Sequence, residues 1–433
     1  MRLDALRPTT ALLIALLIVA GSPGAKAGLP RFQTPIAHIV VIMQENHSFD
    51  NYFGTFPGAN GLSKAPAWAQ AKAFHARAAL DPCECYPSGY YNGTNWTWPA
   101  ADNFGYYNGS DIPVYWQWAR QYVLLDNYYA SFMGPTLPNH LFLVAGQNGG
   151  ITNDLRSGIN GNPVLPTIFN LLSVAHLTWA YYADTSSGVY AAANNWDPLP
   201  LMGNESYLNH LFPRSQTLQD LASGNLPNVS WVMPFNETAS EHPVVMPGQG
   251  MKQTALLVNA IMDSKYWNST AILLTWDESG GFYDHVVPPM IQGHQVGFRV
   301  PLLVISPWAE QGMIDHTLAD HTSTLAFIES VFGLPCLARD CHMQNLFEAF
   351  DFRPSVHYDP GVLAITAGRH KNATIWVGLR NNLDQFVNVE SSPLFNGSAL
   401  FPLNLQRGSY TVVVILLVNQ VPIDAGFEYS LTV

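Results

Sequence analysis

The hydrophobic residues of this chain form short continuous runs that alternate with segments of helical periodicity between residue 36 and about residue 333. Continuous apolar runs are typical of strands buried on both faces of a sheet, whereas apolar residues three or four positions apart are typical of a covering helix. The alternation predicts an α/β fold with helices on both faces of a sheet. The predicted strands are residues 36–43, 177–183, 229–235, 271–276 and 300–306.

The predicted helices lie between these strands, and the last has clear signals at both ends. Asp320 precedes it as an N-cap, because a carboxylate accepts the free N–H groups of a first turn. Gly333 follows it, since glycine readily adopts the left-handed conformation that ends helices. The predicted helices are residues 112–123, 138–145, 168–175, 252–264 and 321–332.

Beyond about residue 350 the apolar stretches become short and alternating, as in 374–379 and 410–417, and turn residues such as Asn396-Gly397 separate them. This period-two pattern predicts a small β-sandwich. We therefore expect a catalytic domain at residues 28–355 and a C-terminal β-sandwich-like module at 356–433. Nothing in the module suggests chemistry, which favours a structural or attachment role.

The first 27 residues have the pattern of a secretory signal. Arg2 and Arg7 precede an apolar core at residues 11–20, and Ala25-Lys26-Ala27 is a small-x-small cleavage pattern. The core is short for a membrane span, although an uncleaved anchor stays open as an alternative. We expect a secreted protein, or one at the extracellular surface, without a transmembrane span in the mature chain.

The charge balance argues against nucleic-acid binding. Without residues 1–27 the chain has 16 basic and 30 acidic residues, a net charge of −14. A groove that binds phosphate backbones needs a positive surface. Charged residues make up only 12% of the whole chain, whereas Asn, Tyr and Trp are abundant, as on extracellular surfaces.

Glycosylation sequons and paired cysteines fit the same compartment. Cys83 with Cys85 and Cys336 with Cys341 would form two local disulfides in an oxidising environment, although three connectivities are formally open. Several sequons would carry glycans in a glycoprotein, but not Asn46, which lies in a candidate site motif at the end of a predicted strand. The sequons are at Asn46, Asn92, Asn95, Asn108, Asn204, Asn228, Asn236, Asn268, Asn372 and Asn396.

Two predicted strands end in acidic segments. Residues 36–43 lead into Gln44-Glu45-Asn46, and residues 271–276 lead into Asp277-Glu278-Ser279-Gly280-Gly281. Open α/β sheets bind ligands at the carboxyl ends of their strands. Glu45, Asn46, Asp277 and Glu278 offer carboxylate and amide oxygens, which suit a divalent ion of the Mg, Ca or Mn type. A strand that ends in a polar glycine turn is the alternative for either segment alone.

Four motifs in order carry a resemblance to a known family. They are Glu45-Asn46-His47-Ser48-Phe49-Asp50, Thr136-Leu137-Pro138-Asn139-His140, Asp277-Glu278 through Asp284-His285-Val286, and Gly297-Phe298-Arg299-Val300-Pro301. Together they resemble the phosphoesterase family that holds non-specific phospholipases C and acid phosphatases. The resemblance covers residues 36–333 and implies the three-layer α/β/α fold of the alkaline-phosphatase-like proteins.

The resemblance also implies roles for these residues. Glu45, Asn46, Asp277 and Glu278 match the family's metal ligands, and Thr136 matches its nucleophile, which would form a phospho-enzyme intermediate. A helix that begins near Pro138 would direct its free N–H groups at a phosphate. The alternative is that Thr136 only caps that helix.

Histidines that follow strand ends beside acids are the candidates for proton transfer. His242, which resembles a family histidine, and His285 are the predicted general acids. Asn139 and Asp284 are expected to orient other groups. Arg299 would bind substrate phosphate or, as we favour, pair with an acid.

Two departures from the family pattern bear on the substrate. His140 stands where phospholipases C of the family have arginine, and their Pro-His-Ser-Trp-like segment has no match in this chain. We therefore expect a secreted, metal-dependent acid phosphatase, with His140 contacting substrate. A phospholipase C that releases diacylglycerol is the first alternative, and a non-catalytic surface glycoprotein that binds through its C-terminal module is the second.

Between the first two motifs, residues 55–110 form a stretch rich in Trp, Tyr, Asn, Gly and Pro. The stretch is too long for a simple connection, so we expect a structured excursion that forms a wall of the site. Its aromatic residues, Trp96, Trp98, Tyr106 and Tyr107, either line a substrate cleft or pack a loop-rich cap.

Overall fold

The described residues form two compact units. One unit is His38–Phe350, and the other contains residues 34–37 and the described residues from Asp351 onward. No helix among the described residues has the length and hydrophobicity to cross a membrane. The computed structural model describes residues 34–82, 100–154, 165–183, 197–199, 205–234, 236–337, 343–352, 355–359, 361–366, 374–383, 385–393, 398–403, 405–418, 421–422 and 427–432.

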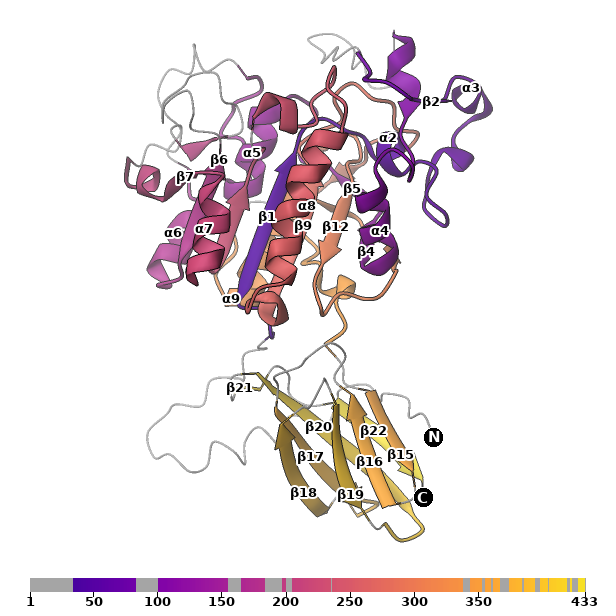
Figure 1. Cartoon of the computed structure of the whole chain (residues 1–433), viewed down its shortest axis with the longest axis vertical. Coiled ribbons are helices and arrows are strands. Elements are labelled where there is room, and N and C mark those ends of the chain that lie inside the picture. Colours follow the sequence, from indigo (N-terminus) through magenta and orange to yellow (C-terminus); the bar gives the residue numbers. More distant parts are fainter. Residues whose placement is uncertain are drawn as a thin grey trace. The chain divides into compact units, whose positions relative to one another are not determined.

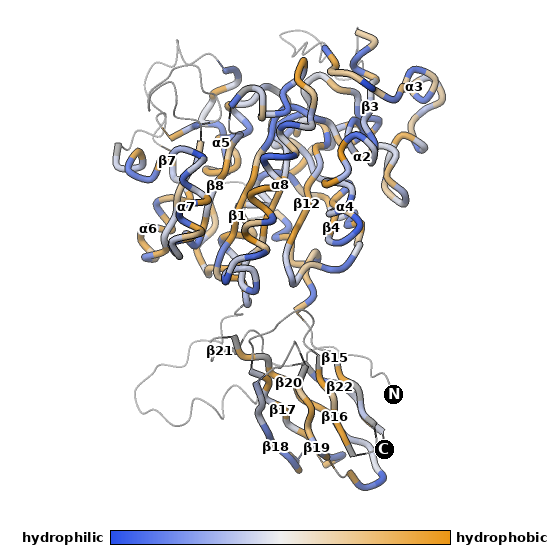
Figure 2. The backbone as a smooth tube through the Cα atoms, viewed as in Figure 1, coloured by the Kyte–Doolittle hydropathy of each residue, from blue (hydrophilic) through white to orange (hydrophobic). Residues whose placement is uncertain are grey.

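An eight-stranded sheet forms the centre of the larger unit (Figure 1). Its strands are rich in apolar residues, as the orange colour along β1 and β12 in Figure 2 shows, and every residue of β9 is buried. In spatial order the strands are β13 (Ile314–Asp315), β4 (Val123–Leu125), β12 (Leu302–Ile305), β9 (Thr270–Trp276), β1 (His38–Gln44), β8 (Val229–Val232), β6 (Trp179–Ala183) and β7 (Leu211–Pro213).

The middle of the sheet is parallel and one side is not. β1 pairs in parallel with both β8 and β9, and β6 extends the parallel part to β7. β12 runs antiparallel to β9, and β4 runs antiparallel to β12. Since Gln44 is in register with Trp276, the chains that leave β1 and β9 begin side by side at one edge of the sheet.

Helices cover both faces of this sheet, which confirms the predicted three-layer α/β/α class. In Figure 1, α8 lies in front of the sheet and α9 behind it. α8 contacts α7 and α4, whereas α5 contacts α9 and α6. Their bounds are α4 (Pro113–Gln121), α5 (Thr136–Ala145), α6 (Ile168–Val174), α7 (Gln216–Ser223), α8 (Gly248–Met262) and α9 (His321–Phe332).

The predicted helices and strands are present, although some begin or end at other residues than predicted. α9 begins after Asp320, whose side chain accepts the Thr322 N–H, and ends at Gly333 with φ 64°. α5 begins at Thr136, two residues before the predicted start, so Thr136 is its first residue rather than its cap. Val123 belongs to β4 instead of the preceding helix. α7 is an additional helix that was not predicted.

The excursion between the first two motifs is built from short elements. Tyr107, one of its aromatic residues, is buried and stands edge-on to the rings of His47 and Tyr52. It therefore packs beneath the first motif, while Trp96 and Trp98 lie outside the described residues. The elements of this part are α2 (Phe49–Phe53), a 3₁₀ turn at Leu62–Lys64, α3 (Ala67–Gln70), β2 (Phe74–His75), a 3₁₀ turn at Ala101–Phe104 and β3 (Gly105–Tyr106).

Short pairs of strands and 3₁₀ turns complete the larger unit. β14 pairs with β5, and β10 forms a small hairpin with β11. These elements are β5 (Tyr128–Tyr129), β10 (Met290–Ile291), β11 (His294–Gln295), β14 (Ala319–Asp320), and 3₁₀ turns at Glu205–His210, Glu237–Ala239, Trp267–Ser269 and Phe347–Ala349.

The C-terminal unit consists of antiparallel strands in two sheets. One sheet has the order β15-β16-β19, and the other has β18-β17-β20-β21 with β22 paired to β20. These strands fit the small antiparallel β-structure expected for this part. They are β15 (Ser355–Asp359), β16 (Gly361–Thr366), β17 (Thr374–Asn381), β18 (Phe386–Pro393), β19 (Ser398–Leu403), β20 (Ser409–Val418), β21 (Val421–Pro422) and β22 (Phe427–Thr432). The roles assigned to residues 28–355 and 356–433 stay predictions.

Several expectations lie on residues that the structure does not describe, among them the signal at 1–27 and three of the four cysteines, Cys83, Cys85 and Cys341. The described cysteine, Cys336, is in a disulfide. Asn46 is buried, which agrees with its exclusion as a glycan site.

Candidate active site

The acidic ends of β1 and β9 meet directly. The backbone N–H of Asn46 donates to Asp277 Oδ1 at 2.9 Å, and the Asp277 N–H donates to the Gln44 carbonyl at 3.0 Å. Asn46 adopts φ 60°, which asparagine tolerates better than most residues. A Cβ on Gly280 would stand 2.3 Å from the Asn46 carbonyl oxygen, so the loop after β9 requires glycine there.

Asp277 is buried in a setting that disfavours its charge. Oδ1 also accepts the Glu278 N–H at 2.8 Å, whereas Oδ2 is buried and accepts no hydrogen bond within the described part of the chain. Burial raises the pKa of Asp277 to about 7, although the Asn46 N–H, the Thr136 side chain and the charge of His242 oppose the shift. A cation bound to Oδ2 would stabilise the ionised form of this carboxylate.

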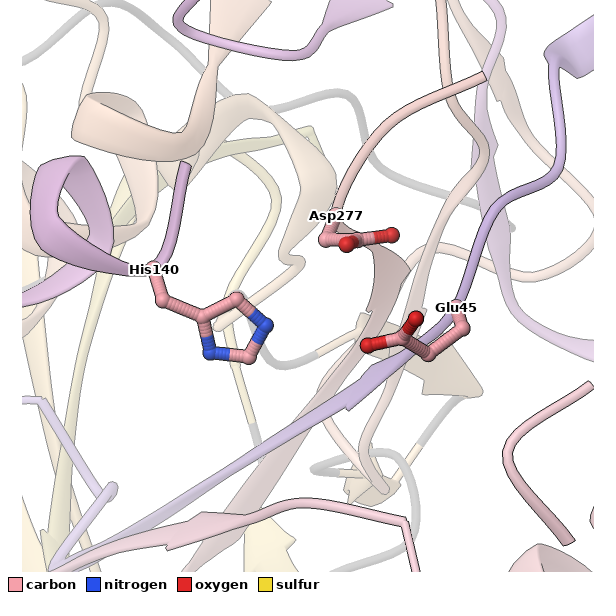
Figure 3. A group of neighbouring side chains, drawn as sticks. All are labelled: Glu45, His140 and Asp277. Atoms are coloured by element: carbon pink, nitrogen blue, oxygen red, sulfur yellow. The ribbon is translucent and has the colours of Figure 1, made fainter. Parts of the chain in front are cut away.

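Three buried side chains form a group that is suited to hold a metal ion. One ligand atom from each of Glu45, His140 and Asp277 lies within 4.8 Å of the others. Figure 3 shows the outer edge of the His140 ring directed toward the two carboxylates. Two carboxylates and an imidazole form a donor set that fits a divalent cation.

The group shares two residues with the four predicted ligands. Glu45 and Asp277 belong to it, but Glu278 does not, and its Oε2 instead accepts the Gly280 N–H at 2.6 Å. Asn46 lies beside the group, because its backbone N–H donates a hydrogen bond to Asp277. His140, which we expected to contact substrate, takes the third position.

Thr136 reaches the same place from the first turn of α5. It is buried beside Asp277, close enough to lower the pKa of that carboxyl. The Asn139 side chain holds the preceding turn, because its Oδ1 accepts the Phe132 N–H at 2.9 Å and its Nδ2 donates to the Gly134 and Pro135 carbonyls. Asn139 thus positions Thr136.

The start of α5 is less open than we predicted. The Leu137 N–H already donates to Asp154 Oδ1 at 2.8 Å, and Pro138 has no N–H to offer. A phosphate at this helix would therefore meet fewer free donors than the motif suggested.

The loop after β8 brings His242 to the site. The Ser240 carbonyl accepts the Glu45 N–H at 2.9 Å, which joins this loop to the end of β1. His242 is partly buried, and its charge acts on both Asp277 and His47. Its Nδ1 contacts the Pro243 carbonyl at 3.1 Å, and its predicted role as a general acid stays a prediction.

Its neighbour Glu241 is a buried junction. Its carboxylate accepts hydrogen bonds from the side chains of Tyr52 at 2.8 Å, Trp276 at 3.1 Å, Gln44 at 3.2 Å and also Tyr115. Burial nevertheless raises the pKa of Glu241 to about 7. Through these hydrogen bonds Glu241 connects β1, α2, α4 and β9.

The structure places His285 in a different cluster. Its Nδ1 contacts Asp50 Oδ2 at 2.7 Å, and its Nε2 contacts Asn60 Oδ1 at 3.3 Å. Both ring nitrogens are thus engaged with residues other than Asp277. The cluster also contains Asp284 and Arg299.

Arg299 forms the centre of this second cluster. It is fully buried, donates from Nε to Asp284 Oδ1 at 2.8 Å and from Nη2 to Asp50 Oδ1 at 3.3 Å. Its Nη1 donates to the carbonyls of Asn60 and Asp126. These contacts engage the guanidinium within the protein, which is the acid-pairing role that we favoured over phosphate binding.

Sequence reasoning missed the metal-facing position of His140 and the junction at Glu241. One signal was available for His140. It stands four residues after Thr136, so both side chains lie on one face of the helix. No local pattern indicated Glu241, because its partners come from four separate segments.

Comparisons with known proteins identify relatives of this chain. A non-hemolytic phospholipase C from Pseudomonas aeruginosa is 29% identical over 69% of this chain, which spans about half, 54%, of that protein. Phospholipase C A from Mycobacterium tuberculosis is 28% identical over 75% of this chain and 78% of that protein. Non-specific phospholipase C6 from Arabidopsis thaliana is 24% identical over 71% and 70%.

The structural likenesses are more distant. A lipoteichoic acid synthase from Listeria monocytogenes gives a TM-score of 0.42 at 11% identity, over 77% of this chain and 85% of that one. At this distance it carries no argument about the site. The model of the Phosphoesterase family matches residues 36–335, which include every predicted site residue, and the chain belongs to the Phosphoesterase family.

Proposed function

We propose that the chain is a metal-dependent hydrolase of phosphoric esters that uses Thr136 as its nucleophile. One observation carries the proposal: Thr136 at the start of α5 is buried beside Asp277 at the end of β9, within a group of metal-ligating side chains. Thr136 is the first residue of the helix and not its N-cap, which is Pro135. A capping role therefore does not explain why its side chain contacts Asp277.

Glu45, Asp277 and His140 would hold the ion, with Asn46 beside them. A bound divalent ion would neutralise charge on the phosphoryl oxygens and favour the ionised form of the threonine hydroxyl. The side chains around it exclude water, because all four are buried. The donor set of two carboxylates and an imidazole fits a divalent ion.

The reaction has two steps in this proposal. Thr136 Oγ, which has lost its proton to solvent, bonds to phosphorus, the bond from phosphorus to the leaving oxygen breaks, and His242 gives that oxygen a proton. Water then attacks the phosphothreonine, His242 takes one proton from it, and the bond from phosphorus to Oγ breaks. The phosphate product is released, and Thr136 returns to its ionised form and His242 to its protonated form. His285 takes no part, because its ring nitrogens contact Asp50 and Asn60.

We further propose that phospholipids are the substrates, so that diacylglycerol is released. The relatives named above are phospholipases C. The loops after β8 and β9 also expose apolar side chains that suit a lipid surface. Their exposed fractions are 63% for Val244, 42% for Met246, 68% for Val287 and 60% for Met290.

Val244 supports this proposal through its backbone. It adopts φ 69° two residues after His242, a conformation that β-branched residues rarely accept and that costs about 1–3 kcal/mol. Strain of this size at an exposed valine beside a site is typical of a functional loop. The export expected from residues 1–27 would bring the chain to such substrates.

Small phosphate monoesters, which we expected from the sequence to be the substrates, are the second candidate. The observation in their favour is His140, which replaces the arginine of family phospholipases C and lies beside the carboxylates. The metal group, Thr136 and His242 would suffice for a monoester, which offers little to recognise beyond its phosphate.

One assay decides between the two substrates. Purified protein would be given phosphatidylcholine and an aryl phosphate, with and without a chelator, from acidic to neutral pH. We expect a higher kcat/KM for the lipid, with diacylglycerol as product, and loss of both activities with the chelator. A preference for the aryl phosphate would make the chain a phosphatase, and no hydrolysis of either would contradict the proposal.

A covalent test addresses Thr136. We expect Thr136→Ala to abolish turnover and Thr136→Ser, which keeps a hydroxyl, to retain a measurable part of it. Rapid acid quench with labelled substrate should trap phosphothreonine in the wild type only. Turnover near the wild-type rate in Thr136→Ala would reduce Thr136 to a structural residue.

A further inference from the structure

The imidazole of His140 changes the chemistry of an otherwise oxygen-rich group. It is buried on α5, and one of its ring nitrogens lies within 4.8 Å of a carboxylate oxygen from Glu45 and from Asp277. Two ligands on one ion at bond lengths of about 2.1 Å lie no more than about 4.2 Å apart. The three atoms therefore need to approach by only a few tenths of an ångström.

The side of the ring that faces away from the carboxylates has a contact of its own. His140 Nδ1 lies 3.4 Å from the hydroxyl of Tyr181 on β6, a long hydrogen bond. Metal-binding histidines commonly contact a second polar group through the nitrogen that does not bind the ion. Tyr181 fixes the ring plane, and the other nitrogen faces the carboxylates, as Figure 3 shows.

The charges leave room for a cation. The positive charge of His242 lowers the pKa of Asp277, although burial raises it overall. The group combines two buried carboxylates with an imidazole, whereas an arginine pairs with Asp284 in the neighbouring cluster. A divalent ion would supply the missing positive charge.

We propose that His140 is a metal ligand, and that it gives this site selectivity for a transition ion such as Zn²⁺ over Ca²⁺ or Mg²⁺. The proposal rests on the proposed function and departs from the predicted Mg, Ca or Mn type of site. Imidazole nitrogen suits Zn²⁺ and other transition ions, whereas Ca²⁺ and Mg²⁺ prefer oxygen alone. An arginine at residue 140, as in family phospholipases C, would be unable to bind a cation.

Metal binding without turnover tests the proposal. Protein freed of metal would be titrated with Zn²⁺, Mn²⁺, Mg²⁺ and Ca²⁺ by calorimetry. We expect one Zn²⁺ per chain, bound more than about 100-fold tighter than Ca²⁺ or Mg²⁺. The variant His140→Gln should lose more than about 100-fold in Zn²⁺ affinity and keep its weak Mg²⁺ affinity. Equal Zn²⁺ affinity in the two proteins would overturn the proposal.

The control is His38→Gln, which removes a histidine at the opposite end of β1, where Nδ1 contacts the Pro227 carbonyl at 2.8 Å. It should bind Zn²⁺ as the wild type does. Zn²⁺ affinity lowered as much in His38→Gln as in His140→Gln would count against a specific role for His140.

A spectroscopic measurement on the wild type needs no variant. Pulsed electron paramagnetic resonance of the Cu²⁺-loaded protein should show coupling to an imidazole nitrogen, and its absence would overturn the assignment. The same coupling in folded His140→Gln would also overturn it. Failure of Asp277→Asn to change binding of any ion would instead place the whole site elsewhere and contradict the proposed function.

Discussion

Two clusters, each of two acids and a histidine, form where the segments after β1 and β9 meet, yet they are completed in different ways. Glu45 and Asp277 come first after β1 and β9, while Asp50 and Asp284 come a few residues later in the same segments. Each pair has a histidine in reach of both carboxylates. In the later cluster the cation is Arg299, whereas the earlier cluster has no guanidinium among its strongest influences.

The difference shows which acids are available for chemistry. Arg299 hydrogen-bonds to both Asp50 and Asp284 and lies over the ring of Phe49, so that cluster is complete within the protein. It fastens the loop after β1 to the loop after β9. The earlier cluster has an acceptor, Asp277 Oδ2, that no described residue satisfies. One cluster holds the segments after β1 and β9 together, and we propose that the other binds an ion.

The largest expected effect comes from removing an acid of the earlier cluster. Asp277→Asn keeps the size of the side chain and removes its charge, so bound metal should be lost and kcat/KM should fall more than about 10³-fold. Metal content by mass spectrometry and hydrolysis rates on one preparation would measure both. The unfolding free energy should change little, and a metal-loaded, active Asp277→Asn protein would remove the contrast between the clusters.

The next effect is on stability, in the later cluster. Arg299→Met leaves two carboxylates buried without their partner, and it should lower the free energy of unfolding by about 3–5 kcal/mol. Urea unfolding followed by tryptophan fluorescence measures this. Arg120→Met, at an exposed arginine over Trp116, is the control and should cost less than about 1 kcal/mol. If Arg299→Met unfolds during purification, Arg299→Lys should show a smaller loss of the same sign.

Much of the fold could be predicted because its signals are local. The apolar runs identified β1, β6, β8, β9 and β12, and the cap residues of α9 set both of its ends. The shift of α5 to Thr136 was not visible, because the Pro135-Thr136-Leu137 segment enters the helix without a side-chain cap. α7 has few apolar residues and depends on packing against α8.

The site was less predictable, because motif spacing does not show which way a side chain faces. Asp277-Glu278 and Asp284-His285 are equally acidic in sequence, and only the position of Arg299 separates them. Glu278 lies outside the group of Glu45, His140 and Asp277, and its Oε2 accepts the Gly280 N–H. His140 lies inside this group, on the helix whose preceding turn Asn139 holds.

Glu241 is a third kind of buried acid, because the side chains that donate hydrogen bonds to its carboxylate are neutral. Its folded pKa of about 7 lies above the ordinary value of 4.5, so the folded state binds more protons between these pH values. The free energy of unfolding should therefore fall as the pH rises through this window, by about 3 kcal/mol for this group. Stability would then be greatest at acidic pH.

The variant Glu241→Gln isolates that contribution, because glutamine resembles the protonated acid and does not titrate. Measured in chelator from pH 4 to pH 8, the wild type should lose stability relative to the variant across the window. Asp277 and Asp284, whose pKa values burial also raises, contribute to both proteins alike. Parallel stability curves for the two proteins would mean that Glu241 is ionised throughout.

The smallest expected effect separates the two histidines. His285→Gln removes a ring that contacts Asp50 and Asn60, so it should cost about 1 kcal/mol of unfolding free energy and leave kcat within about threefold. His242→Gln, in the loop that contacts Glu45, should instead lower kcat by about 10²–10⁴-fold with little change in stability. Both would be assayed with metal content matched to the wild type. A large loss of kcat in a stable, metal-loaded His285→Gln protein would restore His285 as the general acid that its motif suggested, and would make the Arg299 cluster part of the catalytic machinery.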